Sequence, residues 1–233
     1  MSARAAILDR IREALRLSAP PPGSHEPGAH GPGAGHAAGV EDGAFREWLP
    51  AVGPAIGDWI ALFAACSENL RTRFIVCDSE AEAAQQVRAI AAEDRWSRIA
   101  SHRADPVRAV AGAAGVPVLW TDGGYEPGAL EACDAGLSGC DALVAQTGGV
   151  LLTARSGGGR ALSVLPPHHL VVARRSQMVP DLPAAFALLT TRYGADYPSM
   201  MTFITGPSRT GDIERILVLG AHGPRKLTVL LVP

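Results

Sequence analysis

Hydroxyl, guanidinium, carboxylate and imidazole groups gather near the carboxyl end of this 233-residue chain, in segments 206–214 and 219–224. Arg209 carries a planar donor fork suited to a carboxylate or phosphate, and His222 is of a type that titrates near neutrality. Polar side chains on loops held by a buried sheet form many binding sites in α/β folds. We therefore predict a small-anion pocket here; a purely structural loop is the alternative. Its expected members are Gly206, Ser208, Arg209, Thr210, Asp212, Glu214 and His222.

A second polar segment, Gln146-Thr147-Gly148-Gly149, lies between two apolar runs. Its amide and hydroxyl offer hydrogen bonds, and the glycines let backbone N–H groups approach a ligand closely. The alternative is a hairpin turn in which glycine supplies positive φ. We include all four residues in the predicted pocket, which requires the loops near Thr147 and Arg209 to converge on one crevice.

The histidine pair in Pro-Pro-His-His, at 166–169, is the third candidate. Neighbouring side chains of an extended segment point to opposite faces, so at most one of the two imidazoles faces a site. We include His168 in the predicted pocket. A histidine that only makes a structural hydrogen bond at the start of a strand is the alternative.

Alternating strands and helices of the main domain are expected to position these groups. Residues 1–17 have helical spacing, residues 18–42 are a flexible Pro/Gly/His linker, and residues 43–233 form one α/β domain. The pattern predicts a strand at 73–77 followed by a helix at 80–94, and further alternation downstream. Such alternation favours a largely parallel central sheet. The strand-rich C-terminal third favours an antiparallel edge or a second small sheet, and Ser208 is expected to cap a short helix through Glu214.

Composition excludes several classes of function. The net charge of −2 provides no broad basic field for nucleic acid. No apolar run approaches the length of a membrane span and no signal peptide is recognisable, so we expect a cytoplasmic protein. The four cysteines form no Cys-x-x-Cys pair, so we expect neither a metal nor an iron–sulphur cofactor in this chain. No Gly-Lys-Ser/Thr triplet occurs, which excludes a P-loop.

Four motifs together resemble the LUD (lactate-utilization) domain family, specifically its lactate-utilization protein C type, also called the LutC or YkgG type. They are TGPSRTGDIE at 205–214, LGAHGP at 219–224, DALVAQTGG at 141–149 and LPPHHLVV at 165–172. The resemblance implies a fold similar to the NagB/RpiA/CoA-transferase-like α/β fold, with helices on both faces of a central, largely parallel sheet.

The resemblance also implies a function. Family members support oxidation of L-lactate to pyruvate beside iron–sulphur oxidoreductase subunits. This chain would be the accessory, cluster-free subunit, with the clusters in its partners and a small carboxylate in its pocket. Relatives often have glutamate where this chain has Gln146, and an amide can neither form an acyl-enzyme intermediate nor act as a general base. Two alternatives stay open: a stand-alone enzyme on a sugar phosphate or CoA ester, and a non-catalytic ligand-binding or regulatory module.

Overall fold

The computed structural model describes residues 49–211, 217–220 and 222–233, which lie within one compact unit. The predicted N-terminal helix at 1–17 and the linker at 18–42 lie outside the described residues. Asp212 and Glu214 lie outside them as well. No helix in the described ranges is long and apolar enough to cross a membrane.

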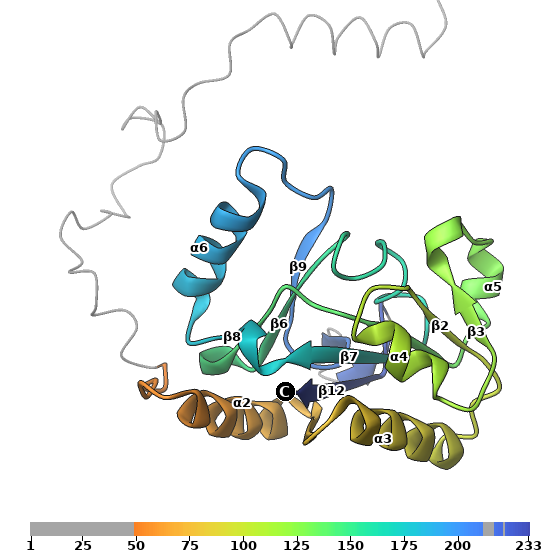
Figure 1. Ribbon diagram of the computed structural model, residues 1–233, viewed down its shortest axis with the longest axis horizontal. Helices are drawn as coiled ribbons and strands as arrows, with labels where there is room; N and C mark the ends of the chain where they lie inside the picture. The colour runs from red at the N-terminus through yellow and green to blue at the C-terminus, as the bar shows by residue number, and fades with distance from the viewer. Residues whose placement is uncertain (1–48, 212–216, 221) are drawn as a thin grey trace, which may run out of the picture. The chain divides into compact units, whose positions relative to one another are not determined.

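A parallel sheet forms the centre of the fold (Figure 1). Every neighbouring pair of its strands is parallel, which confirms the predicted α/β class. Its strands, in spatial order, are β1 (Arg73–Val76), β12 (Lys226–Val232), β7 (His168–Arg174), β4 (Ala135–Ser138), β2 (Ile99–Ser101) and β3 (Val118–Trp120). The last strand of the chain thus pairs between β1 and β7. Strands covered on both faces are expected to be apolar throughout, and β7 and β12 are buried along most of their length.

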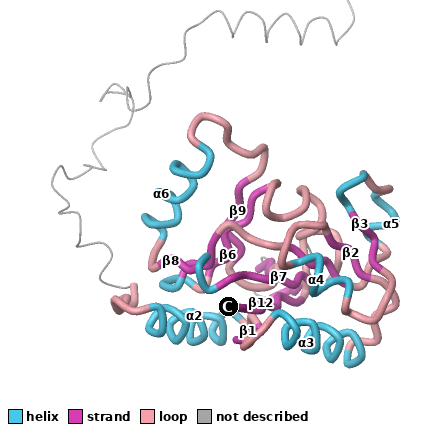
Figure 2. The backbone as a smooth tube through the Cα atoms, viewed as in Figure 1, coloured by secondary structure: helices cyan, strands magenta, loops and turns pink. Residues whose placement is uncertain are grey.

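Helices cover both faces of this sheet, as predicted. α3 (Glu80–Glu93) and α4 (Val107–Gly112) pack on one face through a core that includes Ile99, Leu170 and Leu230. The Ser79 side chain caps α3 by accepting the Glu82 N–H at 3.1 Å. The opposite face is covered in part by α2 (Ile56–Leu70) and α5 (Pro127–Glu131). In Figure 2, α2 and α3 lie along the lower edge of the view with β1 between them.

A second, smaller sheet packs on the same face as α2. Its order is β8 (Met178–Val179), β5 (Ala142–Val144), β6 (Gly149–Thr153) and β9 (Met201–Ile204). β6 is antiparallel to both β5 and β9, so the predicted second sheet is present. Its inner side chains meet those of β7 and β12 in one core, and α6 (Leu182–Tyr193) covers its outer face. β9 forms one edge of this sheet.

The predicted short helix after Ser208 is wrong. Residues from Arg209 onward form a strand, β10 (Arg209–Gly211), which pairs antiparallel with β11 (Leu217–Leu219). Gly206, at φ +97°, turns the chain before this hairpin, a conformation that glycine adopts without strain. The apolar run that includes Leu217 and Leu219 supplies the pairing strand. Strand pairing therefore overrides the local capping signal.

Candidate functional site

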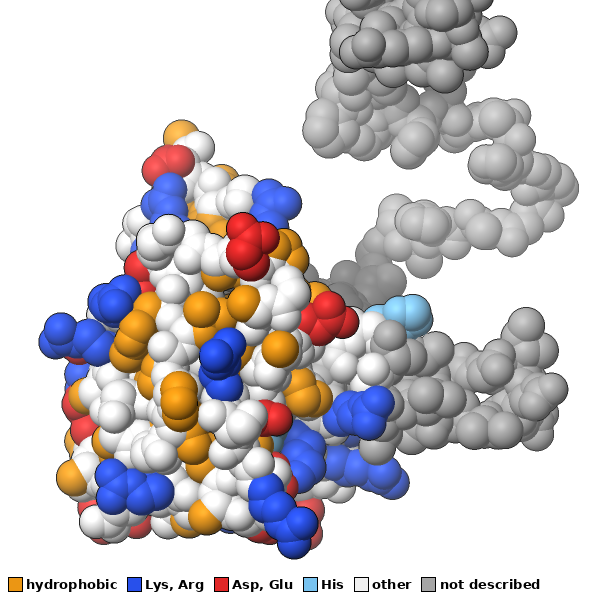
Figure 3. Space-filling model, turned by 90° about the vertical axis from the view of Figure 1, so that its right-hand side faces the viewer, with side chains coloured by type: hydrophobic (Ala, Val, Ile, Leu, Met, Phe, Trp, Pro, Cys, Tyr) orange, Lys and Arg blue, Asp and Glu red, His pale blue; other side chains and the backbone are white. Residues whose placement is uncertain are grey.

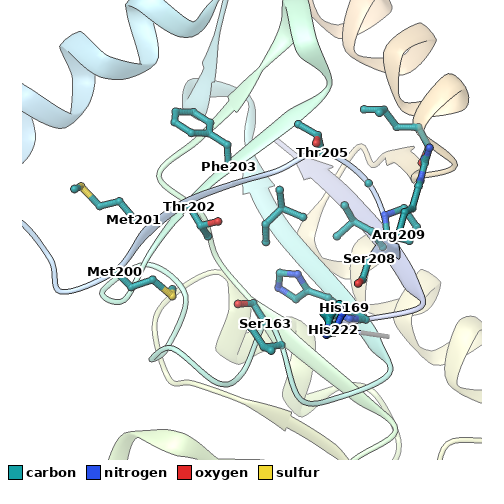
Figure 4. A pocket seen from close by; sticks show the side chains of 18 residues that line it. Ser163, His169, Met200, Met201, Thr202, Phe203, Thr205, Ser208, Arg209 and His222 are labelled. Carbon is teal, nitrogen blue, oxygen red and sulfur yellow. The ribbon is translucent and has the colours of Figure 1, made fainter. Parts of the chain in front are cut away.

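A cavity of about 780 Å³ lies beside β9, between the small sheet and the start of β7 and β12 (Figure 4). One wall is formed by the continuous segment Met200–Arg209. The other wall consists of Leu70, Ser163, Val164, His169, His222, Gly223, Pro224 and Leu227. Four residues of the predicted pocket therefore meet here: Gly206, Ser208, Arg209 and His222.

Backbone hydrogen bonds hold the polar end of this cavity together. The Ser208 N–H donates to the Pro224 carbonyl at 2.9 Å, and the Gly220 N–H donates to the Ser208 carbonyl at 2.9 Å. The Arg209 guanidinium donates to the Leu70 carbonyl at the end of α2. A guanidinium has five N–H donors, so this bond orients the group and leaves others for a ligand. The loops from 206 and from 222 are thus joined at one place, as the anion-pocket prediction requires.

His169 forms part of the cavity wall from β7 and was not among the predicted members. Its side chain is buried, and its Nε2 lies 2.8 Å from Ser138 Oγ. The Ser138 hydroxyl donates to the Gly139 carbonyl at 2.9 Å, so it accepts from Nε2–H. Nδ1 is then a lone-pair acceptor, and no described residue hydrogen-bonds to it. Burial, together with the neighbouring His168, lowers the pKa of His169 to about 3, so the imidazole is neutral near pH 7.

His168 lies on the opposite face of β7, away from this cavity. Its Nε2 lies 2.9 Å from Thr228 Oγ1 and its Nδ1 lies 3.3 Å from Asp94 Oδ2. The Trp96 ring packs edge-on against it. Burial lowers the pKa of His168 to about 4 although Asp94 opposes the shift. The expectation that only one imidazole of the pair faces the pocket is met, but the one that does is His169. Strand alternation requires one of the two; which one depends on the register of β7.

The Gln146–Gly149 segment does not line the cavity. The Gln146 side chain donates to the Pro50 carbonyl at 2.9 Å, and the Cys66 thiol donates to the Gln146 carbonyl at 3.6 Å. Gly148 has φ +63°, and a Cβ there would lie 2.8 Å from Cys66 Cβ. The glycine thus permits close packing against α2 and not the approach of a ligand. Thr147 Oγ1 is buried without a hydrogen bond to any described residue.

The two predicted loops nevertheless approach the same helix end. A Cβ on Gly148 would lie 3.0 Å from Leu70 Cδ1, and a Cβ on Gly206 would lie 2.7 Å from the Leu70 carbonyl oxygen. Leu70 therefore separates the two loops, and only the loop at 206–209 opens to the cavity. Thr210 continues this loop as part of β10.

Sequence reasoning also missed the long β9 wall. Thr202 and Thr205 contribute hydroxyl-bearing residues to it, and Ser163 faces it from the loop before β7 (Figure 4). β9 carries only a weak strand signal, because Met201–Ile204 is four residues long and its neighbours are small and polar. The apolar residues Met200, Phe203 and Ile204 were the available clue, since apolar residues in so short a segment indicate burial against a neighbouring element.

The cysteines are poorly placed for metal ligation. Cys77, Cys133 and Cys140 are buried and Cys66 is half-buried. Burial raises the pKa of all four thiols, that of Cys77 to about 11; the thiolates that bind metals are therefore disfavoured. Within the described ranges no three His, Cys, Asp or Glu side chains gather at metal-ligating positions.

Charges are mixed over the surface. The face shown in Figure 3 intersperses basic side chains with acidic, apolar and neutral ones, and the net charge of the chain is −2. An anion is therefore attracted by local groups such as Arg209, not by a broad positive field.

The class of protein follows from the α/β fold and from two comparisons. The crystal structure of a DUF162 family protein from Deinococcus radiodurans shares the fold, with a TM-score of 0.60 at 22% identity, covering 77% of this chain and 99% of that one. Residues 129–232 match the LUD domain family. The resemblance to the LUD domain family stated from the sequence is thereby confirmed, and the matched residues include the whole cavity wall from Ser163 to Leu227.

Individual relatives carry a common name. Lactate utilization protein C of Geobacillus kaustophilus is 37% identical over 106 residues, which are 45% of this chain and 44% of the relative. Lactate utilization protein C of Deinococcus radiodurans is 35% identical over 129 residues, which are 51% of this chain and 60% of the relative. The chain thus matches about half the length of these curated relatives.

Proposed function

We propose that this chain serves in lactate utilization as an accessory subunit without an iron–sulphur cluster, and that its cavity holds a small carboxylate. The names of the relatives support a role in lactate utilization, and the accessory, cluster-free place within it is what the family resemblance implies. The observation that carries the second part is the position of Arg209 at a cavity it shares with Ser208 and His222.

The polar end of the cavity has the groups that a carboxylate needs. A guanidinium fork pairs with both oxygens of a carboxylate, and such charge-assisted bonds are stronger than neutral ones. The Ser208 hydroxyl and the His222 imidazole offer further hydrogen bonds on the same side (Figure 4). Lactate also has a hydroxyl, which can donate to an acceptor such as His169 Nδ1 after a small adjustment, since that atom has no partner among the described residues.

The role of this chain is binding, with electron transfer elsewhere. Oxidation of lactate to pyruvate removes two electrons and two protons, and we place the electron acceptor in iron–sulphur partner subunits. With a pKa near 3, His169 accepts a hydrogen bond readily but is a weak base at neutral pH. The same observation favours the second candidate, a ligand-binding or regulatory module without chemistry of its own.

A stand-alone enzyme on a CoA ester or sugar phosphate is less well supported. Acyl transfer at position 146 would need a carboxylate, whereas Gln146 is an amide. Its side chain is engaged by the Pro50 carbonyl, and it does not line the cavity. The geometry therefore gives no reason to place a covalent intermediate at this position.

Growth of the host organism on L-lactate tests the proposal. Cells lacking this chain are expected to grow poorly on L-lactate as sole carbon source and normally on pyruvate. The wild-type chain should restore growth, whereas Arg209→Ala should restore little. Arg108→Ala is the matched control, because Arg108 is an exposed arginine of α4 whose ion pair among the described residues is with exposed Asp105 at 3.5 Å. Undiminished growth on lactate without the chain would refute the proposed role, and full rescue by Arg209→Ala would refute the pocket.

A further inference from the structure

The cavity follows the edge of a strand. Ten consecutive residues, 200–209, line it. Side chains of a strand alternate between its two faces, so a cavity on one face would be lined by every second residue only. All four residues of β9, Met201–Ile204, line the cavity, which places it along the edge of this strand, and the turn at 205–208 continues the wall beyond the strand. Five extended residues span about 16 Å, so the cavity is a groove as long as a short peptide. We call this the β9 groove, lined by residues 200–209 on one side and by Ser163, Val164 and Leu227 on the other.

The backbone of β9 has free hydrogen-bonding groups toward this groove. The Ala154 N–H donates to the Met200 carbonyl at 3.0 Å, and Leu152 lies opposite Thr202 in the ladder. Backbone groups alternate in direction along an antiparallel strand, so those of Met201, Phe203 and Thr205 point away from β6. No described residue pairs with them, since β9 ends the order of its sheet.

We propose that the β9 groove binds an extended peptide segment of another protein, which adds to the small sheet as a strand beside β9 and places a carboxylate at Arg209. Peptides bind in this way where a sheet edge is free and pockets receive alternate side chains. The inference goes beyond the role in lactate utilization and does not rest on it. The carboxylate of the peptide would occupy the same place at Arg209 as the small carboxylate of the proposed function, so the two ligands would compete.

The groove is longer than a small carboxylate bound at Arg209 would need. The cavity measures about 780 Å³, and pockets of about 300–1,000 Å³ enclose ligands of drug size. A three-carbon acid would occupy only the Arg209 end. The remaining length would leave the backbone groups of Met201 and Phe203 without partners.

The side chains along the groove define the chemistry of the segment. Met201 and Val164 are apolar and 45% and 43% exposed, and Leu227 also lines the groove, whereas the Phe203 ring packs toward α6, 5.5 Å from the ring of Phe186. Arg209 forms no ion pair with any described carboxylate. The bound segment therefore has apolar residues at alternate positions and an acidic residue or a chain terminus at the end next to Arg209.

Selection from a random peptide library tests this. Heptapeptides with free carboxyl termini are displayed on phage and selected against the full chain, and the recovered sequences are synthesised for fluorescence-polarisation titration. Met201→Pro removes an N–H that points into the groove and is not part of the β6 ladder. Met201→Ala, the matched control, keeps that N–H. Circular dichroism of both variants confirms that each is folded.

Recovered peptides are expected to bind Met201→Pro at least about tenfold more weakly than Met201→Ala, as the loss of a backbone hydrogen bond and the steric block of the added strand require. Arg209→Ala should weaken binding by a similar factor. Amidation of the terminus or replacement of an acidic residue by its amide identifies which carboxylate is bound. Recovery of no binding peptide, or equal affinity for the Met201→Pro and Met201→Ala variants, would overturn the proposal. The titration contains no lactate, so its outcome is independent of the growth experiment.

Discussion

Two adjacent histidines of β7 differ in their hydrogen bonds. One lies in a region where both of its ring nitrogens have partners, and the other lies in a region where one ring nitrogen has none among the described residues. On one face of β7, both ring nitrogens of His168 have partners, Thr228 and Asp94, and Asp94 is also bound by Lys226 at 2.7 Å. On the other face, His169 has a partner for Nε2 but none among the described residues for Nδ1, and it lies on a cavity wall. Burial is nearly equal for the two side chains, so burial does not distinguish a structural histidine from one available to a ligand. The partners do.

The regions around Asp141 and Arg209 differ in the same way, in whether their charged groups have hydrogen-bond partners. The Asp141 carboxylate is buried and accepts hydrogen bonds from Arg192 at 2.7 Å, Tyr193 at 2.6 Å and Ser156 at 2.6 Å. Arg209 instead donates to one carbonyl among the described residues and faces a cavity. A buried group with all its bonds made contributes to one specific packing. A group with unused donors at a cavity is free to bind something else. The comparison predicts that mutations of the first region change stability and that mutations of the second change binding.

The largest expected effect is that of Asp141→Ala. Burial disfavours the charged carboxylate, but the hydrogen bonds from Ser156, Tyr193 and Arg192 outweigh it and lower the pKa of Asp141. Asp141→Ala removes three hydrogen bonds to a buried carboxylate, and hydrogen bonds to charged groups contribute about 1.5–3 kcal/mol each. Urea unfolding should therefore show a loss of several kcal/mol. Glu93→Ala is the control, because Glu93 is 67% exposed in its pair with Arg73 and exposed pairs contribute about 0–1 kcal/mol. Similar losses of unfolding free energy for the two variants would contradict the view that the hydrogen-bonded Asp141 region stabilises the fold.

Acidification by one pH unit is expected to have the next largest effect. The pKa values of His168 and His169 lie near 4 and 3 in the folded chain, against 6.5 in the unfolded chain. Below pH 6.5 the unfolded state therefore binds protons that the folded state does not. The contribution of the two neutral histidines to the free energy of unfolding is fully present above pH 6.5. It falls as the pH drops toward 4, by about 1.4 kcal/mol per pH unit for each histidine.

The variant His169→Gln sharpens this test. It removes one of the depressed titrations, so the slope of unfolding free energy between pH 6 and pH 5 should become shallower by about 1.4 kcal/mol per pH unit. Burial also lowers the pKa of His102, which adds a contribution of the same sign that the variant leaves in place. Urea unfolding at pH 7, 6 and 5 measures the slopes. An unchanged slope in His169→Gln would show that the imidazole on the cavity side is protonated in the folded chain.

Gly148→Ala should have a smaller effect, confined to stability. A Cβ at φ +63° and 2.8 Å from Cys66 Cβ requires both backbone strain and movement of α2, and overpacking of this kind costs about 1–3 kcal/mol. Peptide binding in the β9 groove should be unchanged, because the turn does not line it. A loss of binding without a loss of stability would instead place this turn in the site, as the sequence suggested.

The architecture could be predicted from the sequence because its signals are local. The strand at 73–76, its Ser79-capped helix and the strand-rich end of the chain follow from apolar runs and capping residues. The short strands β2 and β4 could not, since Ala100 and Gly136 lie in segments with little strand propensity and are held by parallel pairing to distant strands. Long-range strand pairing also determines that His169 faces the cavity and that the residues after Ser208 form a strand.

The candidate site was predicted in part for the same reason. Gly206, Ser208, Arg209 and His222 share one loop region, and spacing alone brings them together. The members contributed by β9 and by Ser163 come from separate parts of the chain. Their meeting depends on how the small sheet packs against β7, which no local motif encodes. Conversely, Gln146 and Thr147 have ligand-binding residue types but are used in packing against α2 and the segment near Pro50.

The smallest expected effect is that of Gln146→Glu, which introduces the residue type that the family resemblance implies for this position. The carboxylate would lose the N–H that donates to the Pro50 carbonyl, and one hydrogen bond of a half-buried side chain contributes about 0.5–1.5 kcal/mol. We expect a small decrease in the urea midpoint, with Gln146→Ala as the control that removes the same bond without adding charge. Peptide affinity and growth on lactate should match the wild type. If the glutamate instead changed either of them, position 146 would influence ligand binding although Leu70 lies between it and the cavity. The turn at 146–149 would then belong to the site.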